Sequence, residues 1–186
     1  MADCVLWRRV DVPGHEIAKL ETRDGGWELS GCAIFLAEEG PSKLEYSIIC
    51  DSAWRTSSAR ISGAIGGREV NLSVVVDAER RWHLNGVECS AVEGCVDIDL
   101  GFSPSTNLLP IRRVALAVGE VAEVLAAWLP FPSLRFELLP QVYRREGESR
   151  YRYESGGGAF VRMLDVNAAA FVTRYPGLWE AESAFS

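Results

Sequence analysis

The stretch TSSARISGAIGGREVNLSVVVD, residues 56–77, decides the fold class of this sequence. It holds two β-like segments, Thr56–Ile65 and Arg68–Asp77, on either side of the dipeptide Gly66-Gly67. A two-residue Gly-Gly turn is a strong hairpin signal, because both turn positions need a positive φ. Apolar and polar residues alternate in the second segment, whose apolar face carries Val70, Leu72, Val74 and Val76. The stretch therefore predicts two antiparallel strands with one buried face.

The same pattern extends in both directions from this hairpin. Turn residues recur about every ten positions, and most intervals between them are β-like. The further predicted strands are Gly14–Thr22, Trp27–Ala37, Lys43–Cys50, Arg80–Leu84, Val96–Leu100, Ile111–Val118, Arg135–Arg145, Arg150–Ser155, Ala159–Val166 and Ala169–Arg174. An antiparallel sheet of this many strands must hide its edges, by closing into a barrel or by curling. We predict an all-β fold with residues 1–186 in a single domain: a curled antiparallel sheet, or incomplete β-barrel, with few or no helices.

Two segments are harder to interpret. In residues 120–129, Val121, Leu125 and Trp128 lie at helical spacing, but the neighbours on both sides are β-like, so we interpret the segment as a strand. Residues 101–110 contain two prolines and are interpreted as an irregular loop. Arg112 and Arg113 would then begin the next strand and face opposite sides of the sheet.

Composition excludes several classes of partner. The chain carries 26 acidic and 19 basic residues, a net charge of −7, whereas duplex nucleic acid needs a basic face; we expect no nucleic-acid partner. No apolar run reaches the roughly 18 residues of a membrane-spanning helix, and no secretory signal is seen, which predicts a cytoplasmic location. Five cysteines without a CxxC pair and two histidines give no metal-site spacing, so neither a metal nor a cofactor is expected.

The densest group of polar residues begins with Asp97 and Asp99. In a strand these two carboxylates share one face, with their Cα atoms roughly 6.5 Å apart. They could form the acid–base pair of a sugar-directed hydrolase or lyase. Acids at a strand end also pair with arginines, and Arg112 and Arg113 are close in the sequence. Both interpretations stay open, although no nucleophile or tuned base elsewhere favours catalysis.

Four segments together resemble a known family. They are Trp54–Thr56, Gly94–Arg113, Tyr151–Ser155 and Tyr175–Trp179. They resemble a bacterial family named for glycolipid binding, formerly a domain of unknown function, and the similarity extends over nearly the whole chain. The most specific parts are the block that runs from DID at 97–99 to LPIR at 109–112 and the YPGLW at 175–179.

The resemblance implies a fold similar to the lipoprotein carriers LolA and LolB, which hold acyl chains in the concavity of an incomplete barrel. It implies a non-enzymatic protein with a lipid or glycolipid ligand, and it carries over no catalytic residue. The apolar concave face would take the acyl chains, and a rim that includes Trp54, Asn107, Arg112 and Tyr153 would meet the polar or sugar head. The remaining alternative is an interaction module whose concavity is filled by its own side chains.

Overall fold

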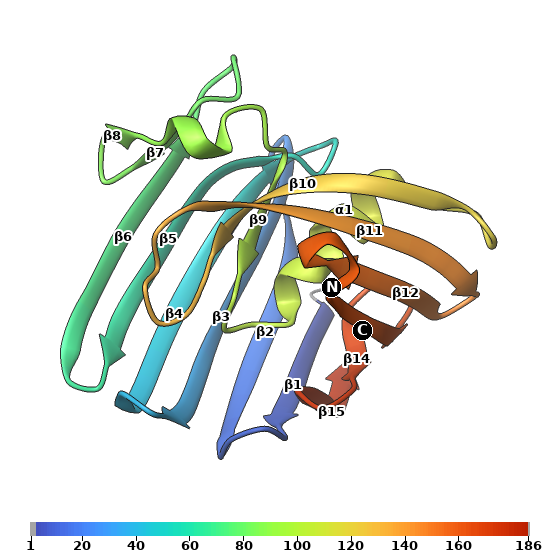
Figure 1. Cartoon of the computed structure of the whole chain (residues 1–186), viewed down its shortest axis with the longest axis horizontal. Coiled ribbons are helices and arrows are strands. Elements are labelled where there is room, and N and C mark those ends of the chain that lie inside the picture. Colours follow the sequence, from blue (N-terminus) through green and yellow to red (C-terminus); the bar gives the residue numbers. More distant parts are fainter. Residues whose placement is uncertain (1–2, 186) are drawn as a thin grey trace.

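The computed structural model describes residues 3–185, which form one long, curled β-sheet (Figure 1). The strands are β1 Asp3–Arg9, β2 Gly14–Arg23, β3 Gly26–Ala37, β4 Gly40–Asp51, β5 Thr56–Ile65, β6 Arg68–Val76, β7 Trp82–Leu84, β8 Val87–Glu88, β9 Asp97–Leu100, β10 Val121–Leu129, β11 Glu137–Gly147, β12 Arg150–Ser155, β13 Phe160–Val166, β14 Val172–Tyr175 and β15 Trp179–Phe185. The short helical segments are η1 Ser90–Val92, η2 Ser105–Asn107, α1 Leu108–Val114 and η3 Gly156–Gly158. The prediction of an all-β fold with a curled, open sheet is confirmed.

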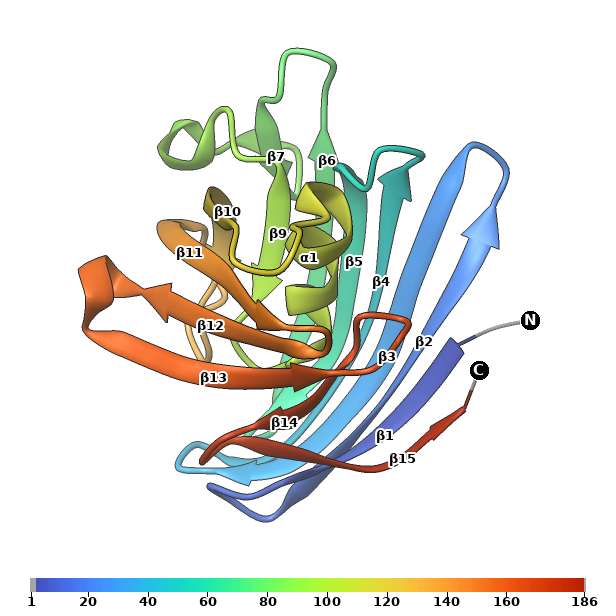
Figure 2. The same ribbon diagram turned by 90° about the vertical axis from the view of Figure 1, so that its right-hand side faces the viewer.

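The chain builds this sheet in two runs of neighbouring strands. From β1 to β8, and again from β9 to β15, each strand pairs with the next. The two runs join where β1 pairs with β15, so the first and last strands lie side by side (Figure 2). The prediction of antiparallel pairing throughout is wrong for β9 and β10, which are parallel. A crossover through η2 and α1 returns the chain to the same end of the sheet, as parallel pairing requires.

The curl brings the start of β9 back to β5. The Thr56 N–H donates to the Val96 carbonyl (3.1 Å), and the Ile98 N–H donates to Thr56 Oγ1 (3.2 Å). The Arg80 guanidinium donates to the carbonyls of Thr56 (2.7 Å), Cys95 (2.9 Å) and Val96 (2.9 Å). One cation therefore joins two segments that lie far apart in the order of the sheet.

The hairpin at residues 56–77 forms as predicted. Ile65 pairs with Arg68, and Gly66 and Gly67 both have positive φ values, 54° and 83°. Val70 and Val74 are buried on the inner face of β6. Local sequence alone accounts for this part of the sheet.

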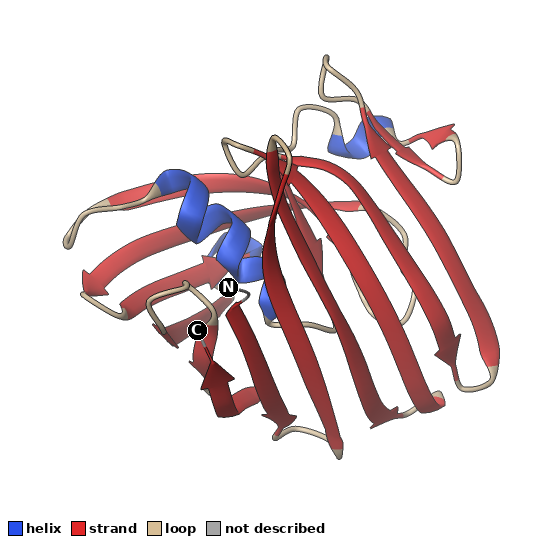
Figure 3. Cartoon of the chain, turned by 180° about the vertical axis from the view of Figure 1, so that it is seen from behind, coloured by secondary structure: helices blue, strands red, loops and turns tan. Residues whose placement is uncertain are grey.

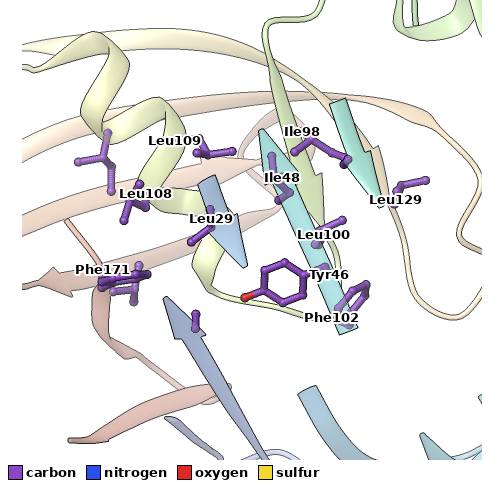
Figure 4. Packing of buried hydrophobic residues seen from close by; sticks show 14 of the residues in the cluster. Leu29, Tyr46, Ile48, Ile98, Leu100, Phe102, Leu108, Leu109, Leu129 and Phe171 are labelled. Atoms are coloured by element: carbon purple, nitrogen blue, oxygen red, sulfur yellow. The ribbon is translucent and has the colours of Figure 1, made fainter. Parts of the chain in front are cut away.

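Helix α1 lies within the curl, where the sequence pattern predicted a loop followed by a strand at Ile111–Val118 (Figures 2 and 3). Both predictions are wrong for residues 108–114, which form α1. Pro110 stands in the first helical turn, where its missing N–H has no partner to lose, and Leu108 and Ile111 are three apart and both buried (Figure 4 shows Leu108). Arg112 and Arg113 therefore lie in the last helical turn. Across residues 3–185, none of the helices has the length and apolar content needed to pass through a bilayer.

Other boundaries differ from the predicted ones. The strand interpretation of residues 120–129 is confirmed by β10, and the pattern did not reveal β1 or β15. The strand predicted at Ala169–Arg174 is observed as β14, which begins three residues later, at Val172. Its first predicted residues belong instead to a turn, in which the Asn167 N–H donates to the Phe171 carbonyl (2.9 Å).

We expect Arg80→Ala to lower the free energy of unfolding by about 2–3 kcal/mol, because buried carbonyls lose a charged donor. Urea unfolding followed by tryptophan fluorescence measures this loss. Arg81→Ala is the matched control, since Arg81 is exposed and its pairs with Asp77 and Glu79 lie at the surface. Equal losses in the two variants would contradict the role of Arg80 in holding the curl.

Candidate functional site

A cavity of about 430 Å³ lies between the β9–α1 connection and the inner face of β10 to β15. This volume is in the range of sites that hold small ligands. The residues that line it are Asp99, Leu100, Gly101, Ser103, Pro104, Asn107, Trp128, Leu139, Tyr153, Ser155, Gly156, Phe160, Tyr175, Leu178 and Trp179. They come from seven strands and the segments between them, so only the curl of the sheet brings them together. None of these lining residues is a lysine, arginine or histidine.

One wall of the cavity is aromatic. The ring centroids of Tyr153, Phe160 and Tyr175 lie 6.1 to 6.3 Å apart; Tyr153 packs edge-to-face on the other two rings, which are tilted to each other by 53°. Tyr153 and Tyr175 are buried, and Trp128 and Trp179 add two further rings. The wall therefore offers flat apolar surfaces held in fixed orientations.

A chain of polar side chains lies beside this wall. The Gln141 amide donates to Asp99 Oδ2 (2.6 Å), the Tyr143 hydroxyl donates to Gln141 Oε1 (3.3 Å), and Asn107 Nδ2 donates to the Tyr143 hydroxyl (2.8 Å). Burial raises the pKa of Asp99 to about 6, against the opposing effect of the Gln141 hydrogen bond. Asp99 is therefore largely ionised at neutral pH, and both Asp99 and Asn107 line the cavity with hydrogen-bonded side chains.

The structure separates the two aspartates of the sequence motif. Asp97 is buried and paired with Arg113, whose Nη2 lies 2.6 Å from Asp97 Oδ2. Burial raises the pKa of Asp97, and the Arg113 hydrogen bond and charge oppose that rise. Asp97 is not among the residues that line the cavity, so only Asp99 of the pair faces it. Within residues 3–185, no three His, Cys, Asp or Glu side chains are grouped as a metal site would require.

The four predicted rim residues fall into two separate places. Asn107 and Tyr153 line the cavity. Trp54 instead stacks on Trp27, with centroids 4.3 Å apart, and the guanidinium carbon of Arg112 lies 5.5 Å from the Trp54 ring centroid. Trp54 has a φ of 66°, and the Asp51 carboxylate accepts from backbone N–H groups in its turn. Trp54 and Arg112 contact each other but do not line the cavity.

A second polar cluster, which the sequence analysis did not identify, joins the β9–α1 connection to the opposite wall. Glu16 on β2 is fully buried, and its Oε1 accepts from the hydroxyls of Tyr46 (2.6 Å) and Ser103 (2.5 Å). Ser105 Oγ lies 2.7 Å from the Tyr46 hydroxyl (Figure 4 labels Tyr46). Glu16 Oε2 has no hydrogen-bond partner in the described part of the chain. Burial raises the pKa of Glu16 to about 8, so this carboxyl is largely protonated at neutral pH.

A glycine makes this cluster possible. Gly31 on β3 stands opposite Tyr46 on one side and Ala18 on the other, and a Cβ there would lie 2.4 Å from the Tyr46 hydroxyl oxygen. Without that Cβ, Tyr46 lies across β3 and reaches Glu16 on β2. The sequence does contain a signal for the burial of Glu16. In a strand, Glu16 lies on the same face as the apolar residues Ala18 and Leu20, which are two and four positions further on.

These observations define an all-β protein with an open, curled sheet that encloses an aromatic-lined cavity. The chain belongs to the family described as "Putative glycolipid-binding", whose family model matches residues 4–181. It is also similar to the crystal structure of a DUF1089 family protein from Pseudomonas aeruginosa, with 31% sequence identity and a TM-score of 0.78 over 89% of this chain and 91% of that chain. No curated protein matches the chain. The family that the sequence motifs indicated is thereby confirmed.

Glu16→Gln is expected to change how stability depends on pH. The pKa of Glu16 is raised from 4.5 to about 8 by folding, so the folded protein keeps a proton that the unfolded chain releases, and stability falls as pH rises through this window. The glutamine variant should be more stable than the wild type above pH 8 by several kcal/mol, at about 1.4 kcal/mol for each pKa unit. Thermal and urea unfolding between pH 4.5 and pH 9 measure the difference.

Glu38→Gln is the control, since Glu38 is exposed. Both glutamine variants should retain the smaller fall in stability, as pH rises from about 4 to about 6, that the raised pKa of Asp99 causes. If Glu16→Gln follows the wild-type curve across the whole range, Glu16 is not the buried acid described above.

Proposed function

We propose that this protein binds a lipid with a sugar head group and that the cavity beside Asp99 holds that head. The observation that carries this proposal is the lining of the cavity, which combines aromatic rings with Asp99, Asn107 and serine hydroxyls and contains no cation. Sugar rings have apolar C–H faces that pack on aromatic rings, and hydroxyl groups that donate to carboxylates and amides. The family description supports the same class of ligand.

The apolar part of the lining suits the start of an alkyl chain. Leu100, Leu139 and Leu178 line the cavity together with the aromatic rings. Each methylene buried against such side chains contributes about 0.8 kcal/mol, so a short alkyl chain adds measurable affinity. Anionic head groups fit less well, because a phosphate or sulfate would be placed near the Asp99 carboxylate without a compensating cation in the lining.

The predicted ligand residues take different roles in this proposal. Asn107 and Tyr153 contact the ligand, and Asp99 and Tyr175 join them. Trp54 and Arg112 contact each other outside the cavity, so they are not ligand residues here. Catalysis by an Asp97–Asp99 pair is not favoured, because Asp97 is held by Arg113 outside the cavity.

Lipid mass spectrometry after organic extraction of the purified protein, together with calorimetric titration of octyl β-D-glucoside, tests the proposal. We expect the wild type to bind the glycoside and Tyr175→Ala to bind it about tenfold more weakly, because a ring of the cavity wall is lost. Trp54→Ala is the matched control, since it removes an aromatic ring outside the cavity, and should bind as the wild type does.

An extract without lipid, combined with no binding of the glycoside by the wild type, would overturn the proposed function. Weakening by Trp54→Ala but not by Tyr175→Ala would instead move the site to the Trp54–Arg112 surface.

A further inference from the structure

We infer that the preferred head group of the ligand carries an ammonium group, as on an amino sugar, and that Asp99 is the residue that selects it. This inference rests on the proposed function and makes the ligand class of the same cavity more specific. It starts from a negative charge that the protein itself leaves without a partner.

No cation of the described residues pairs with Asp99. The nearby Arg113 is engaged by Asp97, and Arg80 donates to backbone carbonyls at the start of β9. Arg162 donates to the Pro176 carbonyl (3.1 Å) and is not among the residues that line the cavity. Within residues 3–185, the Asp99 carboxylate therefore accepts a hydrogen bond only from the neutral Gln141 amide.

One oxygen of Asp99 remains available to a ligand. Oδ2 accepts from Gln141, whereas among residues 3–185 no group donates a hydrogen bond to Oδ1. The side chain is half-buried and lines the cavity, so its exposed part faces the space that the ligand would fill. A ligand donor placed at Oδ1 would complete the hydrogen bonding of this carboxylate.

The charge of Asp99 favours a cationic donor over a neutral one. Its pKa of about 6 leaves the carboxylate largely ionised at pH 7, and no cation of the described residues offsets this charge, whereas Arg113 offsets the charge of Asp97. A buried, uncompensated charge is costly, and an ammonium group would offset that cost through a charge-assisted hydrogen bond. Such bonds are roughly twice as strong as those between neutral groups.

The aromatic wall supports the same class of ligand. Tyr153 and Tyr175 line the same cavity as Asp99, and their ring centroids lie 6.2 Å apart. Aromatic rings attract cations within about 6 Å of the ring centroid. Asp99 and these rings thus form a site with a negative end and electron-rich walls.

The test compares ligands that differ at one position. Octyl β-D-glucoside, its 2-amino-2-deoxy analogue and the N-acetylated analogue share the ring and the alkyl chain, but only the second carries an ammonium group. At pH 7 we expect the wild type to bind the amino compound about tenfold more tightly than either neutral compound. Asp99→Asn should reduce this preference to less than about twofold while still binding octyl β-D-glucoside.

Glu137→Gln is the matched control. It also removes one negative charge, but from an exposed position on β11 outside the cavity lining, so it should leave the preference unchanged. An equal loss of preference in both variants would mean that the general negative charge of the protein, not Asp99, attracts the amine. Circular dichroism and the melting temperature check that each variant folds.

The outcomes separate this inference from the proposed function. If the wild type binds all three glycosides equally, or prefers a neutral one, the inference is overturned and the proposed function stands. If it binds none of them, the inference fails, and the proposed function fails with it when the extract also holds no lipid. The comparison in the wild type decides the inference even if Asp99→Asn does not fold.

Discussion

The Arg80 guanidinium holds the contact on which the rest of the structure depends. It donates to the carbonyls of Thr56, Cys95 and Val96, and thereby fixes the beginning of β9 against β5. A sheet of fifteen strands twists and needs such a contact to define how far it curls. Because β9 is held there, α1 and the loop before it lie inside the curl. The cavity forms between them and the inner face of the C-terminal strands.

Three carboxyl groups, of which Asp97 and Glu16 are buried and Asp99 is half-buried, show how position decides the chemistry of an acidic side chain. Asp97 has a guanidinium partner, and its role is to hold α1 to β9. Glu16 has only hydroxyl partners, and burial favours its neutral form, which ties the loop to the β2–β4 wall. Asp99 has a single amide partner and faces the cavity, so it alone combines a charge with access to a ligand.

The sequence was sufficient where structure is local. The Gly66-Gly67 hairpin and the alternation in β6 could be predicted because a tight turn and a pleated strand are encoded within a few residues. Helix α1 could not, because a seven-residue helix with a proline in its first turn does not repeat long enough to show its period. The parallel pairing of β9 with β10 likewise depends on a crossover, which is not visible in either strand.

The candidate site was only partly predictable for the same reason. Asn107 and Tyr153 lie in motifs that resemble the family, and both line the cavity. Trp54 also lies in such a motif, but its partners Trp27 and Arg112 come from distant segments and hold it outside the cavity. The burial of Glu16 could be predicted from the apolar residues on the same strand face. Its contact with Ser103 could not, because it joins residues 87 positions apart. Contacts of this kind follow from the curl of the sheet and not from local pattern.

The most direct test of this account is a crystal structure of the protein with an alkyl glycoside bound. We expect the sugar ring to lie against the aromatic wall of Tyr153, Phe160 and Tyr175, with one of its polar groups within hydrogen-bond distance of Asp99 Oδ1. A glycoside bound against Trp54 and Arg112, or on the outer face of the sheet, with the cavity filled only by water, would contradict it.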